Sequence, residues 1–368
     1  MQISYLDLGA QYQSIKSEID AAIREVIDNS CFGLDPSVSE FEAAFAEFCQ
    51  AKHCIGVNNG TNALLLALKA VDIGPGDEVV TAANTFVATV AAIVHAGARP
   101  VLVDVDPDSR NLDPTLLSLA LSRRTKAVIP VHLYGRMADM EAIDRVVNRH
   151  DITVIEDAAQ AHGADYRGRR AGSVGRATAF SFYPAKNLGA FGEAGAVTTD
   201  EAGIDRIVRL LRDHGSSNKY THELVGYNAR MAGIQGAVLK VKLGYLQRWN
   251  EDRRRVAGWY RQQLAEVPVV LPSVDNDCRQ VYHLFVIETE RRDELQRFLK
   301  ERGVPSLIHY PVPVHLQPAY AYLDYRRGDF PVAEKLAGEI LSLPIYPELT
   351  ESQVTYVCDQ IREFFHRH

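Results

Sequence analysis

Residues 154–198 read VIEDAAQAHGADYRGRRAGSVGRATAFSFYPAKNLGAFGEAGAVT and contain the pattern that decides the fold. One apolar run, 152–156, ends just before Asp157, and two more follow at 180–183 and 195–199. Short apolar runs between small and turn-forming residues are typical of strands in a sheet that is covered on both faces. The segment therefore predicts three strands of an α/β protein.

The same alternation continues toward the N-terminus. We expect strands at 78–82, 100–105 and 127–132, and helices at 11–30, 38–49, 61–71 and 86–96. Strands that alternate with helices favour a mostly parallel sheet with helices on both faces.

Beyond residue 200 the pattern changes. Residues 212–228 are polar without an apolar period, which predicts a long functional loop. The expected elements after it are a helix at 232–265, a strand at 282–288, a helix at 292–302, a strand at 304–309 and a final helix. We expect a large domain of residues 1–245, a smaller C-terminal α/β domain of residues 246–368, and a ligand cleft between them.

The composition excludes several classes of protein. Hydrophobic residues make up 46% and charged residues 24%, as in ordinary globular proteins, and the net charge of −7 gives no support for nucleic-acid binding. Five cysteines without a CxxC pair argue against a disulfide framework and a structural metal. Asp7 lies where a signal peptide would need an apolar run, so export is not expected. The most apolar stretch, 86–98, is shorter than the ~20 residues that a membrane-spanning helix needs. We expect a cytoplasmic protein without a membrane partner.

Lys186 is the first candidate for chemistry. A lone lysine is usually a solvated surface residue, but Lys186 lies between an aromatic run and a turn that contains Gly189 and Gly192. Burial among such neighbours would lower the pKa of its amine and make it nucleophilic. A lysine that forms a Schiff base needs this property.

Asp157 is the second candidate. At the end of a strand its carboxylate could cap a helix, or it could pair with a protonated pyridine nitrogen, and position alone gives the two equal weight. A pyridoxal ring needs such a carboxylate to act as an electron sink. Gln160, three residues later, could hydrogen-bond to the ring hydroxyl.

A third group could hold a phosphate. Small residues with free amides open the helix that begins near Gly60, Thr61 and Asn62, although many helices begin in this way. Ser181 would add a hydroxyl to the same phosphate. Phe86 could stack on a flat ring, although an aromatic residue at such a position is more often part of the core.

Three motifs together resemble the DegT/DnrJ/EryC1/StrS family of nucleotide-sugar aminotransferases, which are fold-type I pyridoxal-phosphate enzymes. They are NNGTNAL at 58–64, EDAAQAHG at 156–163 and SFYPAKNLG at 181–189, and GYNARM at 226–231 and HYP at 309–311 also match. The likeness runs from about residue 5 to beyond 350. It implies a large domain with a mostly parallel seven-stranded sheet covered by helices, plus a smaller C-terminal α/β domain.

The resemblance also implies roles. Lys186 would form the Schiff base with pyridoxal 5'-phosphate and carry protons, with pyridoxamine 5'-phosphate as the other form of the cofactor. Asp157 would pair with the ring nitrogen and Gln160 with the ring oxygen, and Phe86 would stack on the ring. The residues expected to hold the phosphate are Gly60, Thr61, Asn62, Ser181 and, from the neighbouring subunit of a homodimer, Asn228. Those expected in the sugar pocket are Tyr183, His309 and Tyr310, of which Tyr183 and His309 would also act in catalysis.

The implied reaction moves an amino group from L-glutamate to the ketone of a nucleotide-linked sugar. The HYP run and Tyr183 look most like family members that aminate C3 of a dTDP-3-keto-6-deoxyhexose. Members that act at C4 of UDP-, GDP- or dTDP-4-keto-sugars share every cofactor residue, so they remain an alternative. A regulatory or scaffold homologue without activity is a second alternative, against which the intact Lys186, Asp157 and Gln160 argue.

Overall fold

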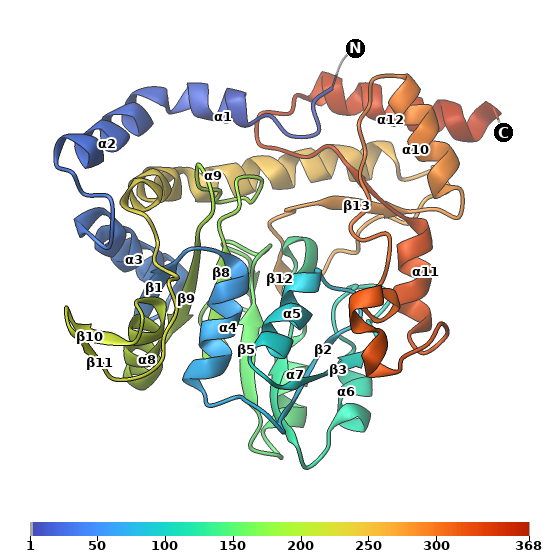
Figure 1. The fold of residues 1–368 in the computed structure, drawn as a ribbon. Helices are drawn as coiled ribbons and strands as arrows, with labels where there is room; N and C mark the ends of the chain where they lie inside the picture. Colours follow the sequence, from blue (N-terminus) through green and yellow to red (C-terminus); the bar gives the residue numbers. More distant parts are fainter. Residues whose placement is uncertain (1–2, 368) are drawn as a thin grey trace.

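The computed structural model describes residues 3–367, and a seven-stranded sheet forms its centre (Figure 1). The strand order is β1-β9-β8-β5-β4-β2-β3, and β9 alone runs antiparallel to its neighbours. The strands are β1 (His53–Val57), β2 (Glu78–Ala82), β3 (Arg99–Val103), β4 (Thr125–Ile129), β5 (Thr153–Asp157), β8 (Ala177–Ser181) and β9 (Gly195–Thr199). The expected mostly parallel seven-stranded sheet is confirmed.

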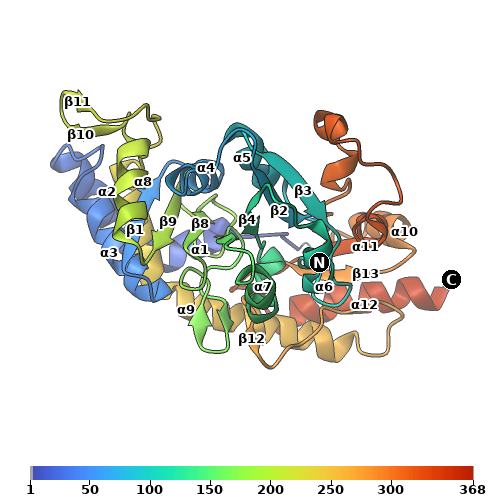
Figure 2. The same cartoon turned by 90° about the horizontal axis from the view of Figure 1, so that it is seen from below.

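Helices cover both faces of this sheet (Figure 2). Side chains alternate along each strand, so that Val79 and Val80 of β2 enter different apolar cores. One core contains residues of α4 (Gly60–Ala70), α5 (Val87–His95) and α8 (Ala202–Arg212). The other contains residues of α3 (Pro36–Cys49), α6 (Pro114–Ala120), α7 (Met140–Val147), α9 (Gly233–Gln263) and α11 (Pro331–Glu339).

The C-terminal segments have a core of their own around a two-stranded antiparallel sheet. This part contains β13 (Phe285–Glu288), α10 (Arg292–Glu301), β14 (Ile340–Leu343) and α12 (Glu351–Arg367). Ile3 also joins this core, and its amide donates to the carbonyl of Gly303 at 3.2 Å. The expected domain boundary at residue 245 falls inside α9, which contacts both α2 (Lys16–Asp28) and α12, and the division stays a prediction.

The remaining elements are short. They are α1 (Leu8–Ser14), β6 (Asp165–Tyr166), β7 (Arg169–Arg170), β10 (Ser216–Asn218), β11 (Thr221–His222), β12 (Cys278–Arg279) and the 3₁₀ turns Leu133–Gly135, Val314–Leu316 and Pro318–Leu323. Within residues 3–367, no helix combines the length and the hydropathy needed to cross a lipid bilayer.

Several expected elements were wrong. The helix at 11–30 is two helices, because Ile15 has non-helical dihedral angles and is buried against a separate apolar cluster that includes Trp249. The polar stretch 212–228 contains the hairpin of β10 and β11. The strand at 304–309 is a single bridge between Leu307 and Ser342, since Pro305 has no amide hydrogen to extend the pairing.

The aromatic strand begins at Ala177 and ends at Ser181, so its polar end faces the site. Among the longer elements, β1, β14, α6, α7, α8 and α11 were not predicted from the sequence.

A buried ion cluster joins α3, β1 and α8. Glu42 is 6% exposed, and its carboxylate accepts the amide of Gly56 at 2.7 Å and the guanidinium of Arg209 at 2.8 Å. The same carboxylate pairs with the buried Arg212. A buried cation of this kind needs its counter-charge.

We expect Glu42→Ala to lower the free energy of unfolding by about 3–5 kcal/mol, because it leaves the buried Arg212 uncompensated. Glu40→Ala on the same helix is the matched control, since it removes an exposed pair with Lys240 and should cost less than about 1 kcal/mol. Urea titrations followed by circular dichroism measure both. Equal losses for the two variants would contradict the assignment.

Candidate active site

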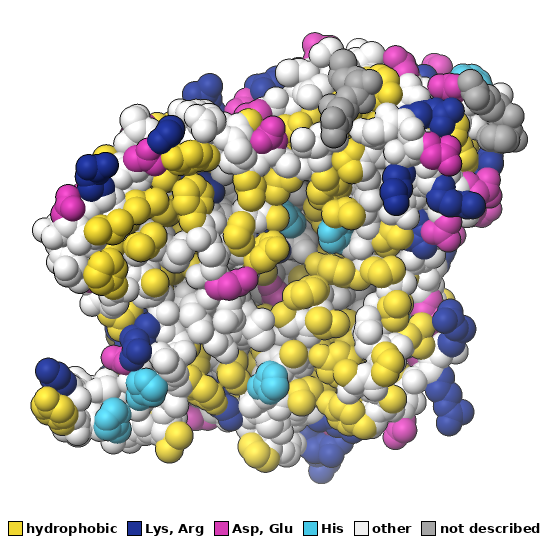
Figure 3. All heavy atoms as spheres, turned by 45° about the horizontal axis from the view of Figure 1, so that its top comes forward, with side chains coloured by type: hydrophobic (Ala, Val, Ile, Leu, Met, Phe, Trp, Pro, Cys, Tyr) yellow, Lys and Arg dark blue, Asp and Glu magenta, His cyan; other side chains and the backbone are white. Residues whose placement is uncertain are grey.

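A cavity of about 470 Å³ opens at the carboxyl ends of the parallel strands. Asp157 ends β5 and Ser181 ends β8, while Gly60 opens the helix that follows β1. In open α/β sheets ligands bind at this edge. Figure 3 shows a hollow bordered by hydrophobic side chains, with histidine side chains close to it.

Most of the residues predicted from the sequence line this one cavity. They are Gly60, Thr61, Phe86, Asp157, Gln160, Ser181, Tyr183, Lys186, His309 and Tyr310. Asn62 and Asn228 are not among the lining residues. The amide of Asn62 donates to the side chain of Asn59 at 2.8 Å, and its own side chain donates to Asn58. Asn228 is exposed, and its backbone bridges to Asp213.

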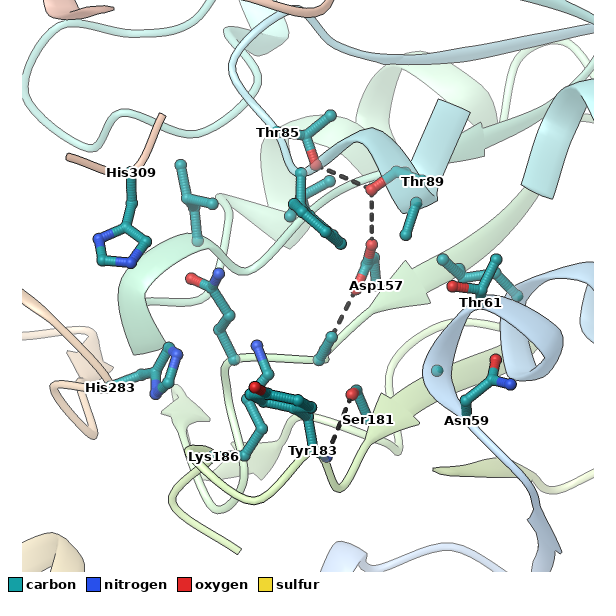
Figure 4. Close-up of a pocket in the computed structure, with 18 of the residues that line it drawn as sticks. Asn59, Thr61, Thr85, Thr89, Asp157, Ser181, Tyr183, Lys186, His283 and His309 are labelled. Atoms are coloured by element: carbon teal, nitrogen blue, oxygen red, sulfur yellow. Dashed lines mark hydrogen bonds between the residues drawn. The ribbon is translucent and has the colours of Figure 1, made fainter. Parts of the chain in front are cut away.

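The carboxyl group of Asp157 lies in a position that is 5% exposed. Burial raises the pKa of this carboxyl, and the hydroxyl of Thr89, the amide of Ala159 and the charge of Lys186 oppose the shift. Thr89 donates to Oδ2 at 2.8 Å and is itself 2.8 Å from the hydroxyl of Thr85, as Figure 4 shows. Ala159 donates its amide to Oδ1 at 3.1 Å. These donors favour the charged form, which can pair with a cationic ring nitrogen.

Hydrogen bonds also fix the backbone of Asp157. The backbone amide of His132 donates to the carbonyl of Asp157 at 2.9 Å. Because side chains alternate along β5, the side chain of Glu156 lies on the opposite face of the sheet. There the carboxylate of Glu156 lies 2.8 Å from Nε2 of the fully buried His132 and accepts the hydroxyl of Thr178 at 2.6 Å. Burial raises the pKa of Glu156, but the bonds from His132 and Thr178 outweigh it and hold that pKa below its usual value. Hydrogen bonds on both faces of the sheet therefore fix the C-terminal end of β5.

Lys186 extends into the cavity from the turn after β8, and Figure 4 shows its amine and the Asp157 carboxylate entering the same space. The backbone amide of Lys186 donates to the carbonyl of Tyr183 at 2.8 Å, which fixes the turn. Burial lowers the pKa of the Lys186 amine to about 8, and the charge of Asp157 opposes the shift. An amine with this pKa is partly neutral near pH 7, so it can act both as a nucleophile and as a proton carrier.

A cradle for an anion lies at the start of α4. The amides of Gly60 and Thr61 belong to the first turn, where a helix has no acceptor of its own for them. A Cβ on Gly60 would lie 2.6 Å from Cβ of Ser181, so only glycine allows the serine hydroxyl to approach. Gly195 is equally constrained, because a Cβ there would lie 2.5 Å from the backbone of Asn59.

Gln160 is oriented by two hydrogen bonds. Its carbonyl oxygen accepts the amide of Tyr134 at 2.7 Å, and its nitrogen donates to the hydroxyl of Tyr310 at 3.1 Å. The second hydrogen on that nitrogen is available to a ligand oxygen. Phe86 is 51% exposed, and its ring centroid lies 5.4 Å from that of Tyr310.

His309 reaches the cavity from the C-terminal segments. Its Nδ1 lies 2.9 Å from the hydroxyl of Ser342. Burial, and next the charge of Lys186, lower the pKa of His309 to about 4, so the imidazole is neutral near pH 7.

The lining residues that the sequence did not indicate include four with polar side chains: Thr85, Thr89, Glu193 and His283. Thr89 lies inside an apolar helix, and only its position beneath Asp157 gives it a role. His283 lies in the expected strand at 282–288, where an isolated histidine carries no signal. Of the four, only Glu193 could have been suspected from the sequence, because it lies close to the motif that contains Lys186.

The sequence profile of the DegT/DnrJ/EryC1/StrS aminotransferase family matches residues 13–362. The chain belongs to this family. Among curated relatives of this aminotransferase, a Streptomyces venezuelae protein named dTDP-3-amino-3,4,6-trideoxy-alpha-D-glucose transaminase is 47% identical, with 100% of this chain and 97% of that protein covered. A Geobacillus stearothermophilus protein named pleiotropic regulatory protein is also 47% identical, with 99% of both chains covered. The crystal structure of S. venezuelae DesV in complex with a ketimine intermediate is similar with a TM-score of 0.98, at 47% identity over 100% of this chain and 99% of that one.

The cavity fits the pyridoxal phosphate that the family resemblance implies. The aminotransferase offers a carboxylate, Asp157, for a ring nitrogen and an amine, Lys186, for an aldehyde. The cradle of Gly60, Thr61 and Ser181 is kept open by the absence of a Cβ and suits a phosphate. These three chemical features lie around one space of suitable size.

We expect Thr89→Val to raise the pKa of Asp157 further, by roughly one to two pH units, because a hydrogen bond to a charged group is worth about 1.5–3 kcal/mol. The carboxylate is charged above its pKa, so the loss of cofactor affinity on acidification should begin at a higher pH. Absorbance titrations with pyridoxal phosphate between about pH 4 and pH 8 measure this. Thr85→Val is the control and should shift the profile less. Coincident profiles for Thr89→Val and the wild type would contradict the role.

Proposed function

We propose that this protein is a pyridoxal-phosphate-dependent aminotransferase that moves the amino group of L-glutamate to C3 of a dTDP-linked 3-keto-6-deoxyhexose. The observation that carries the proposal is the pairing, in one cavity, of a lysine whose pKa is about 8 with a buried carboxylate and an anion cradle. The name of the S. venezuelae relative supports the choice of dTDP as the nucleotide and of C3 as the aminated carbon.

The bound cofactor supplies an electron sink for the carbon that carries the amine. Asp157, which Thr89 and Ala159 hold through hydrogen bonds, would pair with the ring nitrogen and favour its protonated form. Gln160, whose nitrogen also donates to Tyr310, would donate to the ring oxygen, and Phe86 would stack on the ring. The amides of the α4 N-terminus and the hydroxyl of Ser181 would hold the phosphate.

Lys186 moves the protons. With a pKa of about 8, its Nζ can take a proton from a substrate carbon and return it within the cavity near neutral pH. His309 has a pKa of about 4 and stays neutral, so it orients the sugar through hydrogen bonds without competing for that proton. Tyr183, which is 51% exposed, and Tyr310 form the walls of the sugar pocket.

We also propose a homodimer in which Asn228 of one chain completes the phosphate site of the other. Asn228 is exposed and follows the hairpin of β10 and β11, which Figure 2 draws at one extremity of the molecule. Tyr220 and Val225 in this segment are 83% and 94% exposed, which supports a partner on that side. The five cysteines are free, which agrees with the cytoplasmic location that we propose.

A regulatory role is the second candidate function, and the name of the Geobacillus relative favours it. The presence of Lys186, Asp157 and Gln160 in one cavity favours the enzyme. One experiment distinguishes the aminotransferase from a regulatory protein. Purified protein is incubated with pyridoxal phosphate, glutamate and dTDP-, UDP- or GDP-linked 3-keto- and 4-keto-sugars. Amination of the dTDP-3-keto-6-deoxyhexose supports the proposal. Amination of 4-keto-sugars alone would overturn the carbon assignment, and no amination of any sugar would overturn the function.

We expect Lys186→Ala to fold but to lose at least roughly 10²-fold in turnover, because general acid–base transfer alone contributes that much. Lys186→Arg is the matched control for charge. It should be equally impaired, since a guanidinium does not release its proton near neutral pH. Steady-state rates and the visible absorbance of the cofactor measure both variants. Turnover within tenfold of the wild type for Lys186→Ala would reject the assignment.

We expect activity to rise when an Asn228→Ala chain is mixed with a Lys186→Ala chain. In the mixed dimer, the site that uses Lys186 of the first chain receives Asn228 from the second chain and is therefore whole. The measurement is turnover before and after subunit exchange that is verified by mass spectrometry of tagged chains, given that Asn228→Ala alone is strongly impaired. No rise after exchange would mean that Asn228 does not act across the interface.

A further inference from the structure

His283 is a lining residue of the cavity for which the proposed mechanism has no role. It lies just before β13, and its Nδ1 is 3.3 Å from Oδ1 of Asn187, the residue that follows Lys186. In Figure 4 its ring lies near Lys186 at the edge of the same space. The imidazole therefore faces the region where a substrate atom would meet the lysine amine.

A chain of buried amides determines which nitrogen of His283 carries hydrogen. Asn250 donates its side-chain amide to the carbonyl of His162 at 2.8 Å, and a carbonyl can only accept. Oδ1 of Asn250 must then face Asn187, whose amide donates to it at 2.9 Å and to the carbonyl of Val281 at 2.9 Å. Both hydrogens of Asn187 are used, so its Oδ1 is directed at His283.

The imidazole must donate to that oxygen, so Nδ1 carries the hydrogen and Nε2 carries a lone pair. Burial, and next the charge of Lys186, lower the pKa of His283 well below its ordinary value, so the ring stays neutral. Within residues 3–367 no hydrogen bond to Nε2 is present. His283 thus presents a hydrogen-bond acceptor beside the lysine.

We propose that His283 is a positioning residue whose Nε2 accepts a hydrogen bond from a sugar hydroxyl on a carbon adjacent to the ketone. The inference rests on the proposed function. A ketone oxygen cannot donate, so an acceptor at this position selects a neighbouring hydroxyl. Because the ketone carbon must meet Lys186, the neighbouring ring carbons fall close to His283. This bond orients the ketone for the amine transfer.

Two variants separate this role from a structural one. In His283→Asn the side-chain amide nitrogen can take the place of Nδ1 and donate to Asn187. In His283→Gln the side-chain amide oxygen can take the place of Nε2 and accept from the sugar. If His283 only supports Asn187, His283→Asn should behave as the wild type and His283→Gln should be impaired. If Nε2 binds the sugar, His283→Gln should keep the discrimination described below and His283→Asn should lose it.

The test uses the holoenzyme with the keto-sugar that the wild type aminates and with its two deoxy analogues, each lacking the hydroxyl on one side of the ketone. We expect the wild type to lose roughly three- to tenfold in kcat/KM on one analogue, as for one neutral hydrogen bond, and His283→Asn to treat that analogue and the parent sugar alike. Calorimetric Kd values for the corresponding amino-sugar products should show the same pattern.

The glutamate half-reaction, followed by bleaching of the yellow cofactor form, should be unchanged in His283→Asn because no sugar takes part in it. Equal slowing of both half-reactions would overturn the proposal and assign His283 to Lys186 instead. Unaltered discrimination in His283→Asn would overturn it while the aminotransferase function stands. A wild type that aminates no keto-sugar would overturn the proposed function and this inference with it.

Discussion

The rest of the site depends on the groups that offset the burial of the Asp157 carboxyl, which is 5% exposed. Burial disfavours the charge of Asp157, and a buried charge is tolerated only when donors and a counter-charge surround it. Thr89 supplies one donor from α5, the backbone after β5 supplies another, and Lys186 supplies the positive charge. Each of these groups comes from a different element, so the sheet order and the helix positions are all needed to meet one electrostatic requirement.

The same requirement limits what else the cavity can contain. A second cation near Lys186 would compete with it for protons and for Asp157. The two histidines avoid this, because burial and the lysine charge keep His283 and His309 neutral. They can then act as hydrogen-bond partners for a neutral ligand group. The site therefore combines a buried carboxyl group and a buried amine, each of which influences the pKa of the other, with oriented hydrogen-bond donors and acceptors around them.

Only part of this site was predictable from the chain. The motifs around Asp157 and Lys186 identify the cofactor residues, because each needs local features that are visible in one segment: a strand end, small neighbours and a turn. The α4 cradle is also local, although Gly60 proves indispensable only when Ser181 approaches from another strand. Thr89 and His283 carry no motif. Their roles come from hydrogen bonds to Asp157 and Asn187, which are distant in the sequence.

The sequence by itself determined the α/β class, the mostly parallel sheet and the identities of the acid and the amine, since apolar periodicity and short motifs act over a few residues. Its errors fell where long-range packing decides. Ile15 breaks the first helix to reach an apolar cluster that includes Trp249, and the segment after residue 304 pairs through Leu307 alone. The tertiary structure alone decided the pKa values, the tautomer of His283 and the meeting of C-terminal residues with the sheet. Burial and hydrogen-bond direction depend on neighbours in space, and the chain order does not contain them.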